Sequence, residues 1–194
     1  MGFRKQRSVE IIISRLTREI SDIDEYLYVS ASTKDRDLYA GMLERKRDDI
    51  VRAGVLQMHT AIEDLLNDLI IDFILNTEST KRSRKLSTKT GGAVGELLIG
   101  NRSIGFESKL NLAVGLKIIS PKLKEKLKRL NTSRNRCSHN WLLNTAIRRG
   151  KKPKMKKPPL LNFHGKNLHK VEVFKEFLNE FGAIYTRLFL KMVG

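Results

Sequence analysis

The feature that most constrains the fold is an apolar stripe in the first half of the chain. Its members, three or four residues apart, are Val51, Val55, Met58, Ile62, Leu65, Leu69 and Phe73. Such steps return side chains to one side of an α-helix, whereas a strand would alternate polar and apolar residues. The opposite face of the same segment carries charged residues. We therefore predict a long helix over about residues 35–75 that buries one face.

The same spacing recurs elsewhere and predicts an all-α fold. Residues 8–30 carry a stripe of Val9, Ile12, Ile13, Leu16, Ile20, Ile23 and Leu27. The end of the chain carries another, made of Phe174, Phe177, Phe181, Ile184, Leu188 and Met192. Between them, helical spacing returns at Phe106, Leu110, Val114 and Ile118, and again after Pro121, which suits the first turn of a helix.

We expect one helical-bundle domain over residues 1–194, with two long N-terminal helices forming a hairpin over 1–78. A basic, glycine-rich connection follows over 79–105, with a short helix near 93–99. Helices carrying the candidate site occupy 106–143. A basic loop and a small β-hairpin fill 144–170, the strands being 159–163 and 168–171, and the last helix spans 171–194.

Composition limits the class of protein and its cellular location. A hydrophobic content of 40% supports a packed core. There is no apolar run of the roughly 20 residues that a membrane span needs, and no secretory signal pattern. Cys137 is the one cysteine, which excludes an internal disulfide and a thiolate-rich zinc site. We expect a cytoplasmic protein without a membrane partner.

Charge is distributed unevenly and points to a polyanionic partner. The formal net charge is +17, but residues 1–78 have 11 basic and 15 acidic side chains, and residues 79–194 have 27 and 6. Dense positive charge favours nucleic acid through counterion release. The densest run lies among prolines, so we expect a surface loop that binds the RNA backbone. Its lysines are Lys151, Lys152, Lys154, Lys156 and Lys157.

One short motif carries candidate chemistry: Arg134, Asn135, Arg136, Cys137, Ser138 and His139 follow one another. An arginine–asparagine pair with a histidine five residues after the arginine is expected by chance only about 0.02 times in this composition. A permanent cation and an imidazole that titrates near neutrality suit metal-free cleavage of RNA. The preceding Asn131, Thr132 and Ser133 are candidate N-caps, which would place Arg134 and Asn135 in the first turn of a new helix.

Other polar and aromatic side chains are more simply interpreted as structural than as parts of a site. His59 and Glu63 are four residues apart on one helix face, as metal ligands can be, but a local polar pair is the more common arrangement. Cys137 is expected to be buried, Ser133 to be a cap, and Trp141 to anchor the core or stack on a base. His164 and His169 lie in the predicted hairpin and are expected at the surface.

The helical pattern and the motif together resemble the HEPN family, named for higher eukaryotes and prokaryotes nucleotide-binding proteins. The resemblance rests on the two long N-terminal helices, the helix entry at Phe106, the motif from Arg134 to His139, and the closing helix. As architecture it covers most of the chain. Only the six-residue motif is specific.

This resemblance implies a metal-independent endoribonuclease of the toxin or phage-defence type that needs no cofactor. Arg134 and His139 would be its catalytic pair and Asn135 the polar residue after the arginine, with two copies of the motif meeting across a homodimer interface. Arg136 is expected to assist RNA binding. One bacterial branch has a tyrosine two residues after the histidine that is adenylylated by a partner enzyme. Trp141 occupies that position here, so this mode of regulation is not expected.

Two alternatives remain open. The chain could be a HEPN-like module that binds RNA or a nucleotide without cleaving it. It could instead be a helical partner whose basic surface docks an acidic antitoxin or sensor protein. Cleavage of RNA, binding of RNA without cleavage, and absence of RNA binding distinguish the three.

Overall fold

The structure is a computed structural model that describes residues 2–30, 36–79, 92–93, 95–100, 104–148 and 161–193. Within these ranges, side chains are described except at 2–8, 27, 29–30, 36–39, 76–79, 138–148 and 193.

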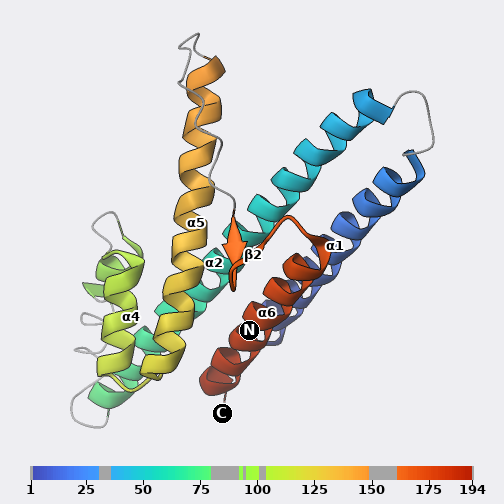
Figure 1. Ribbon diagram of the computed structural model, residues 1–194. Coiled ribbons are helices and arrows are strands. Elements are labelled where there is room, and N and C mark those ends of the chain that lie inside the picture. Colours follow the sequence, from blue (N-terminus) through green and yellow to red (C-terminus); the bar gives the residue numbers. More distant parts are fainter. Residues whose placement is uncertain are drawn as a thin grey trace. The chain divides into compact units, whose positions relative to one another are not determined.

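The described part of the chain is almost entirely helical, which confirms the predicted all-α class. The long helices are α1 (Gly2–Ser30), α2 (Arg36–Ser79), α5 (Pro121–Arg148) and α6 (Val171–Val193), and α4 (Phe106–Gly115) is shorter. Residues 95–99 are also helical, close to the short helix expected there. Figure 1 traces these elements along the chain. None of the described helices is long and apolar enough to cross a membrane.

The chain divides into two compact units. The first contains Met1–His59 and Thr132–Ile184, and the second contains Thr60–Asn131 and Tyr185–Gly194. The divisions fall inside α2, α5 and α6 rather than between elements. The expectation of a single domain stays a prediction.

The core of the first unit is built from the predicted stripes. Fully buried side chains include Leu16, Ile20 and Ile23 of α1, Val51, Val55 and Met58 of α2, and Phe174, Phe177 and Phe181 of α6. Gly54 of α2 lies where a methyl group would be 2.5 Å from the ring tip of Phe174. The helices therefore need a residue without a side chain at this contact. The aromatic rings of α6 also contact Phe163, whose centroid is 5.4 Å from that of Phe177.

The core of the second unit continues the α2 stripe through Ile62, Leu65 and Leu69, together with Leu66 and Ile70. Phe73 was expected in this stripe but is 41% exposed, so the buried face does not extend to it. Helix α4 ends at Gly115 and is followed by a left-handed residue, Lys117, with φ of 59°. There the amide of Ile118 donates to the carbonyl of Ala113 and that of Lys117 to Val114, each at 2.9 Å, which closes the helix end.

Helix α5 begins where Pro121 predicted. The hydroxyl of Ser120 accepts a hydrogen bond from the amide of Leu123 at 3.2 Å, as an N-cap does. The helix then continues without a break to Arg148. Asn131, Thr132 and Ser133 therefore lie inside α5, and the helix start predicted beside Arg134 is wrong. Cap-forming residue types also occur within helices when packing on both sides favours continuation, so composition alone could not separate the two cases.

The β-hairpin exists but is tighter than expected. Strand β1 (Asn162–Phe163) pairs antiparallel with β2 (Lys166–Asn167), so only His164 and Gly165 form the turn. Both have positive φ, 49° and 77°, as the central residues of a type I′ hairpin turn do. The second strand predicted at 168–171 is wrong, because residues 168–170 form a further turn and Val171 already begins α6.

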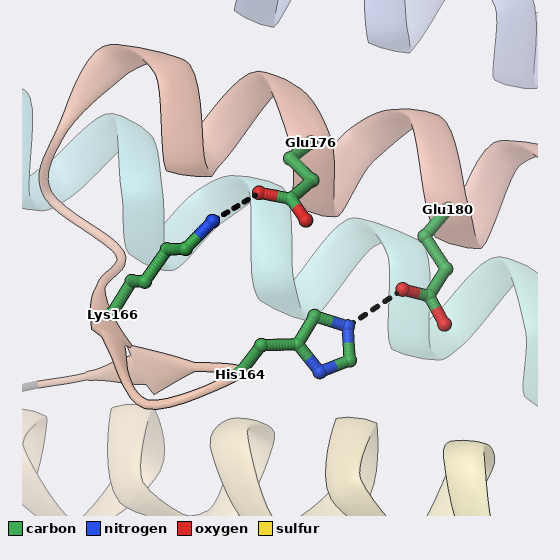
Figure 2. Close-up of polar contacts among 4 residues, drawn as sticks. All are labelled: His164, Lys166, Glu176 and Glu180. Carbon is green, nitrogen blue, oxygen red and sulfur yellow. Dashed lines mark hydrogen bonds and ion pairs between the residues drawn. The ribbon is translucent and has the colours of Figure 1, made fainter.

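Two side-chain contacts fasten this hairpin to α6. Figure 2 shows His164 Nε2 at 2.9 Å from Glu180 Oε2 and Lys166 Nζ at 3.4 Å from Glu176 Oε2. The two glutamates are one helical turn apart on α6. One carboxylate therefore reaches His164 in the hairpin turn, and the other reaches Lys166 in β2. The hairpin is thereby held against the helix that follows it.

Candidate functional site

The arginine of the motif is exposed on α5. Arg134, Asn135 and Arg136 all lie at the surface of the first unit. Arg134 Nη1 donates a hydrogen bond to Asn135 Oδ1 at 3.1 Å. This contact links the guanidinium to the neighbouring carboxamide at the surface of α5.

Several predicted site residues are outside the description. His139 lies within α5, but its side chain is among those not described, as is that of Trp141. Lys151, Lys152, Lys154, Lys156 and Lys157 lie outside the described residues altogether. Of the predicted set, Arg134, Asn135 and Arg136 are therefore the members whose side chains can be placed.

Cys137 marks the side of α5 that is buried. Its side chain is 2% exposed, as predicted. Burial raises the pKa of the thiol from 9.0 to about 11; Arg52 opposes this rise and Asp48 adds to it. The protonated thiol is a poor nucleophile. Cys137 consequently acts as a packing residue beside a charged pair on α2.

That charged pair belongs to a larger polar cluster in the first unit. Arg52 Nε lies 2.6 Å from Asp48 Oδ2, and the Arg52 side chain is only 14% exposed. The other oxygen of the same carboxylate, Asp48 Oδ1, lies 3.6 Å from Nε2 of His169. A further pair joins Arg47 to Asp24 of α1. The cluster thus brings together a histidine, two arginines and two aspartates.

The backbone around His169 is fixed by local hydrogen bonds. The amide of His169 donates to Asn167 Oδ1 at 3.0 Å, and the amide of Leu168 donates to the carbonyl of Leu161 at 2.8 Å. Lys170 N also donates to the carbonyl of Asn167. His169 therefore sits on a turn anchored to the hairpin, with its ring directed to Asp48.

His169 is not the surface group that we expected. Its side chain is 23% exposed. Burial lowers the pKa of its imidazole from the ordinary 6.5; Asp48 opposes this shift, while Arg52 and Arg47 add to it. The lowered pKa favours the neutral ring at pH 7, so one ring nitrogen keeps a lone pair.

Sequence reasoning missed the His169–Asp48 contact. The two residues are far apart along the chain and share no motif, so no periodic signal connects them. The only available hint was the position of His169 two residues after Asn167, which forms a side-chain turn and fixes the local backbone.

Glu63, one member of the His59 and Glu63 pair, contacts a lysine of α4. His59 is buried, and Glu63 Oε1 lies 2.6 Å from Nζ of Lys109. Among the residues that the structure describes, no group of three or more His, Cys, Asp or Glu side chains could hold a metal ion. The carboxylate of Glu63 instead neutralises a buried lysine.

No protein-family model matches this chain, and neither a curated protein nor a solved structure matches it. The relationship to the HEPN family stays a prediction that rests on the motif and the helical pattern.

Proposed function

We propose that this protein is a metal-independent endoribonuclease of the toxin or antiphage-defence type, with Arg134, Asn135 and His139 at its catalytic site. The observation that carries the proposal is an exposed Arg134 joined to Asn135 on a continuous helix that also contains position 139. An exposed guanidinium can meet a phosphate from solvent. A buried arginine could not do so.

The chemistry requires a cation, a base and an acid. The base removes the proton of the ribose 2′-hydroxyl, whose oxygen then attacks the adjacent phosphorus. The acid donates a proton to the 5′-oxygen as its bond to phosphorus breaks. Arg134 stabilises the charge that develops on the phosphate oxygens, assisted by the Asn135 amide. The products are a 2′,3′-cyclic phosphate and a 5′-hydroxyl.

The geometry of α5 favours a site formed by two copies of the chain. Positions 134 and 139 are five residues apart, which places them about 140° apart around an ideal helix. A single copy of the chain therefore does not bring positions 134 and 139 onto one face of the helix. A twofold homodimer, which brings the same surface from both subunits together, would place Arg134 of one copy opposite His139 of the other.

The charge distribution supports RNA as the substrate. Residues 79–194 carry the surplus of positive charge, and Arg136 adds an exposed cation beside Arg134. We propose that Arg136 and the lysines of the 151–157 loop bind the phosphate backbone. Such contacts position RNA without choosing its sequence.

The test is cleavage of 5′-labelled RNA in EDTA, with mapping of both product ends. Arg134→Ala and His139→Ala should abolish cleavage while circular dichroism and melting temperature stay unchanged. Loss of one proton transfer is expected to cost a factor on the order of 10² to 10⁴. The matched control is His164→Ala. This histidine lies on the hairpin and contacts Glu180 of α6, so its loss should not affect cleavage.

Equal cleavage by wild type and His139→Ala would identify a contaminating nuclease and contradict the proposal. Salt-dependent RNA binding without cleavage would favour a non-catalytic RNA-binding module. Absence of RNA binding would favour a helical partner of an acidic antitoxin or sensor protein.

A further inference from the structure

The polar cluster of the first unit includes two charged residues that influence Cys137 in the motif-bearing part of α5. Asp48 and Arg52 both act electrostatically on the buried thiol of Cys137. The same Asp48 carboxylate contacts the ring of His169. A histidine paired with a carboxylate is consequently placed beside the helix segment that carries Arg134.

Helix geometry decides which motif residues share the side of α5 that faces this cluster. Arg134 precedes Cys137 by three residues, which puts the two positions about 60° apart around the helix axis and about 4.5 Å along it. Position 139 follows Cys137 by two residues, so it lies about 160° around the axis from Cys137. Within one copy of the chain, position 134 is therefore nearer than position 139 to the side of α5 that carries Cys137, the residue on which Asp48 and Arg52 act.

The geometry points to His169 as a catalytic base of the ribonuclease site, held by Asp48 and acting with Arg134 of the same copy. This inference rests on the proposed function. His139 of the second copy then serves as the general acid. Each site of the dimer contains Arg134 and His169 from one subunit and His139 from its partner.

The arrangement has the parts that a base needs. The Asp48 carboxylate favours a proton on Nε2 of His169, which leaves the Nδ1 lone pair to accept a proton. Arg52 holds Asp48 in place through its contact with the second carboxylate oxygen. The distance of 3.6 Å between His169 Nε2 and Asp48 Oδ1 is longer than a direct hydrogen bond. Such longer distances are common for catalytic groups before substrate binds. The burial that lowers the His169 pKa keeps the ring neutral at pH 7.

The proposed step is balanced. Nδ1 of His169 takes the 2′-hydroxyl proton, the 2′-oxygen forms its bond to phosphorus, and the 5′-oxygen leaves with a proton from His139 of the partner subunit. Exchange of both protons with water then restores the starting states of the two histidines.

The first experiment compares cleavage of labelled RNA by His169→Ala, Asp48→Asn and His164→Ala, each checked for folding by circular dichroism. His164 is the control because it lies in the hairpin turn, five residues before His169, and has its own carboxylate, Glu180 (Figure 2). We expect His169→Ala to lose a factor on the order of 10² or more in kcat, with partial recovery in added imidazole. His164→Ala should cleave as the wild type does.

A second experiment asks which residues must share a subunit. Inactive His139→Ala and inactive His169→Ala proteins are mixed, denatured and refolded together. Half of the resulting dimers should contain one intact site, which restores about a quarter of the wild-type rate. A mixture of Arg134→Ala with His169→Ala should recover nothing, because each copy lacks a residue that the other cannot supply in the same site.

The outcomes separate the two proposals. Unchanged cleavage by a folded His169→Ala protein, with His139→Ala inactive, would overturn the role of His169 and leave the ribonuclease proposal standing. Recovery in both mixtures, or in neither, would overturn the pairing of His169 with Arg134 in one copy. A wild-type protein that does not cleave RNA would overturn both proposals.

Discussion

Lys109 Nζ of α4 lies 2.6 Å from Glu63 Oε1 of α2, and the lysine side chain is only 4% exposed while that of the glutamate is 27% exposed. The pair joins two helices of the second unit. The difference in exposure means that the two partners depend on the contact to different degrees.

We expect Glu63→Gln to destabilise the fold more than Lys109→Met. The first change leaves a buried ammonium without its counter-charge, at a cost of roughly 3 kcal/mol. The second leaves a carboxylate that can reach water, and the methionine fills the space of the lysine stem. Urea unfolding of both variants and of the double variant measures the effect. Equal losses for the two single variants would contradict it.

Gly54→Ala should destabilise the first unit. Its new methyl group would meet the ring of Phe174 at 2.5 Å, and that ring is fully buried. Overpacking of this kind costs about 1–3 kcal/mol. Gly41→Ala is the matched control on the same helix, since nothing lies within 4 Å of its added methyl group. That variant should gain about 0.5–1 kcal/mol from reduced backbone freedom.

His169 should make the free energy of unfolding depend on pH. Its pKa is lower in the folded protein than the ordinary 6.5, so the unfolded chain binds its proton more readily. The stabilisation associated with the neutral ring is fully present above pH 6.5 and is lost as the pH falls towards and through the folded pKa. Denaturant unfolding between pH 5 and 8 should therefore show a smaller loss towards acid pH in His169→Gln than in the wild type. The same slope in both proteins would show that other groups account for the dependence.

Cys137 should be protected from alkylation in the folded protein. The thiol is buried and its pKa is raised to about 11, so little thiolate is present or accessible at pH 8. Iodoacetamide should label it rapidly in denaturant and slowly in buffer, at a rate set by opening of the first unit. Rapid labelling under native conditions would mean that this part of α5 opens easily. Cys137→Ser should leave RNA cleavage nearly unchanged.

The helices and their buried faces could be predicted from the sequence, because helical periodicity is a local property. Stripes such as Leu16, Ile20 and Ile23 repeat every three or four residues and mark the buried side directly. Pro121 likewise fixed the start of α5, since proline suits the first turn of a helix. The composition of Asn131, Thr132 and Ser133 misled the prediction because their surroundings, not their own preferences, keep them helical.

The sequence by itself determined the all-α class, the start of α5 and the presence of the Arg134 motif, all of which depend on neighbouring residues. Only the tertiary structure decided that Asp48 of α2, which Arg52 contacts, meets His169 of the turn at 168–170. It also decided that Gly54 must accommodate Phe174 and that Glu63 neutralises Lys109. These contacts join residues distant in sequence, and they form because burying the apolar stripes brings their helices together.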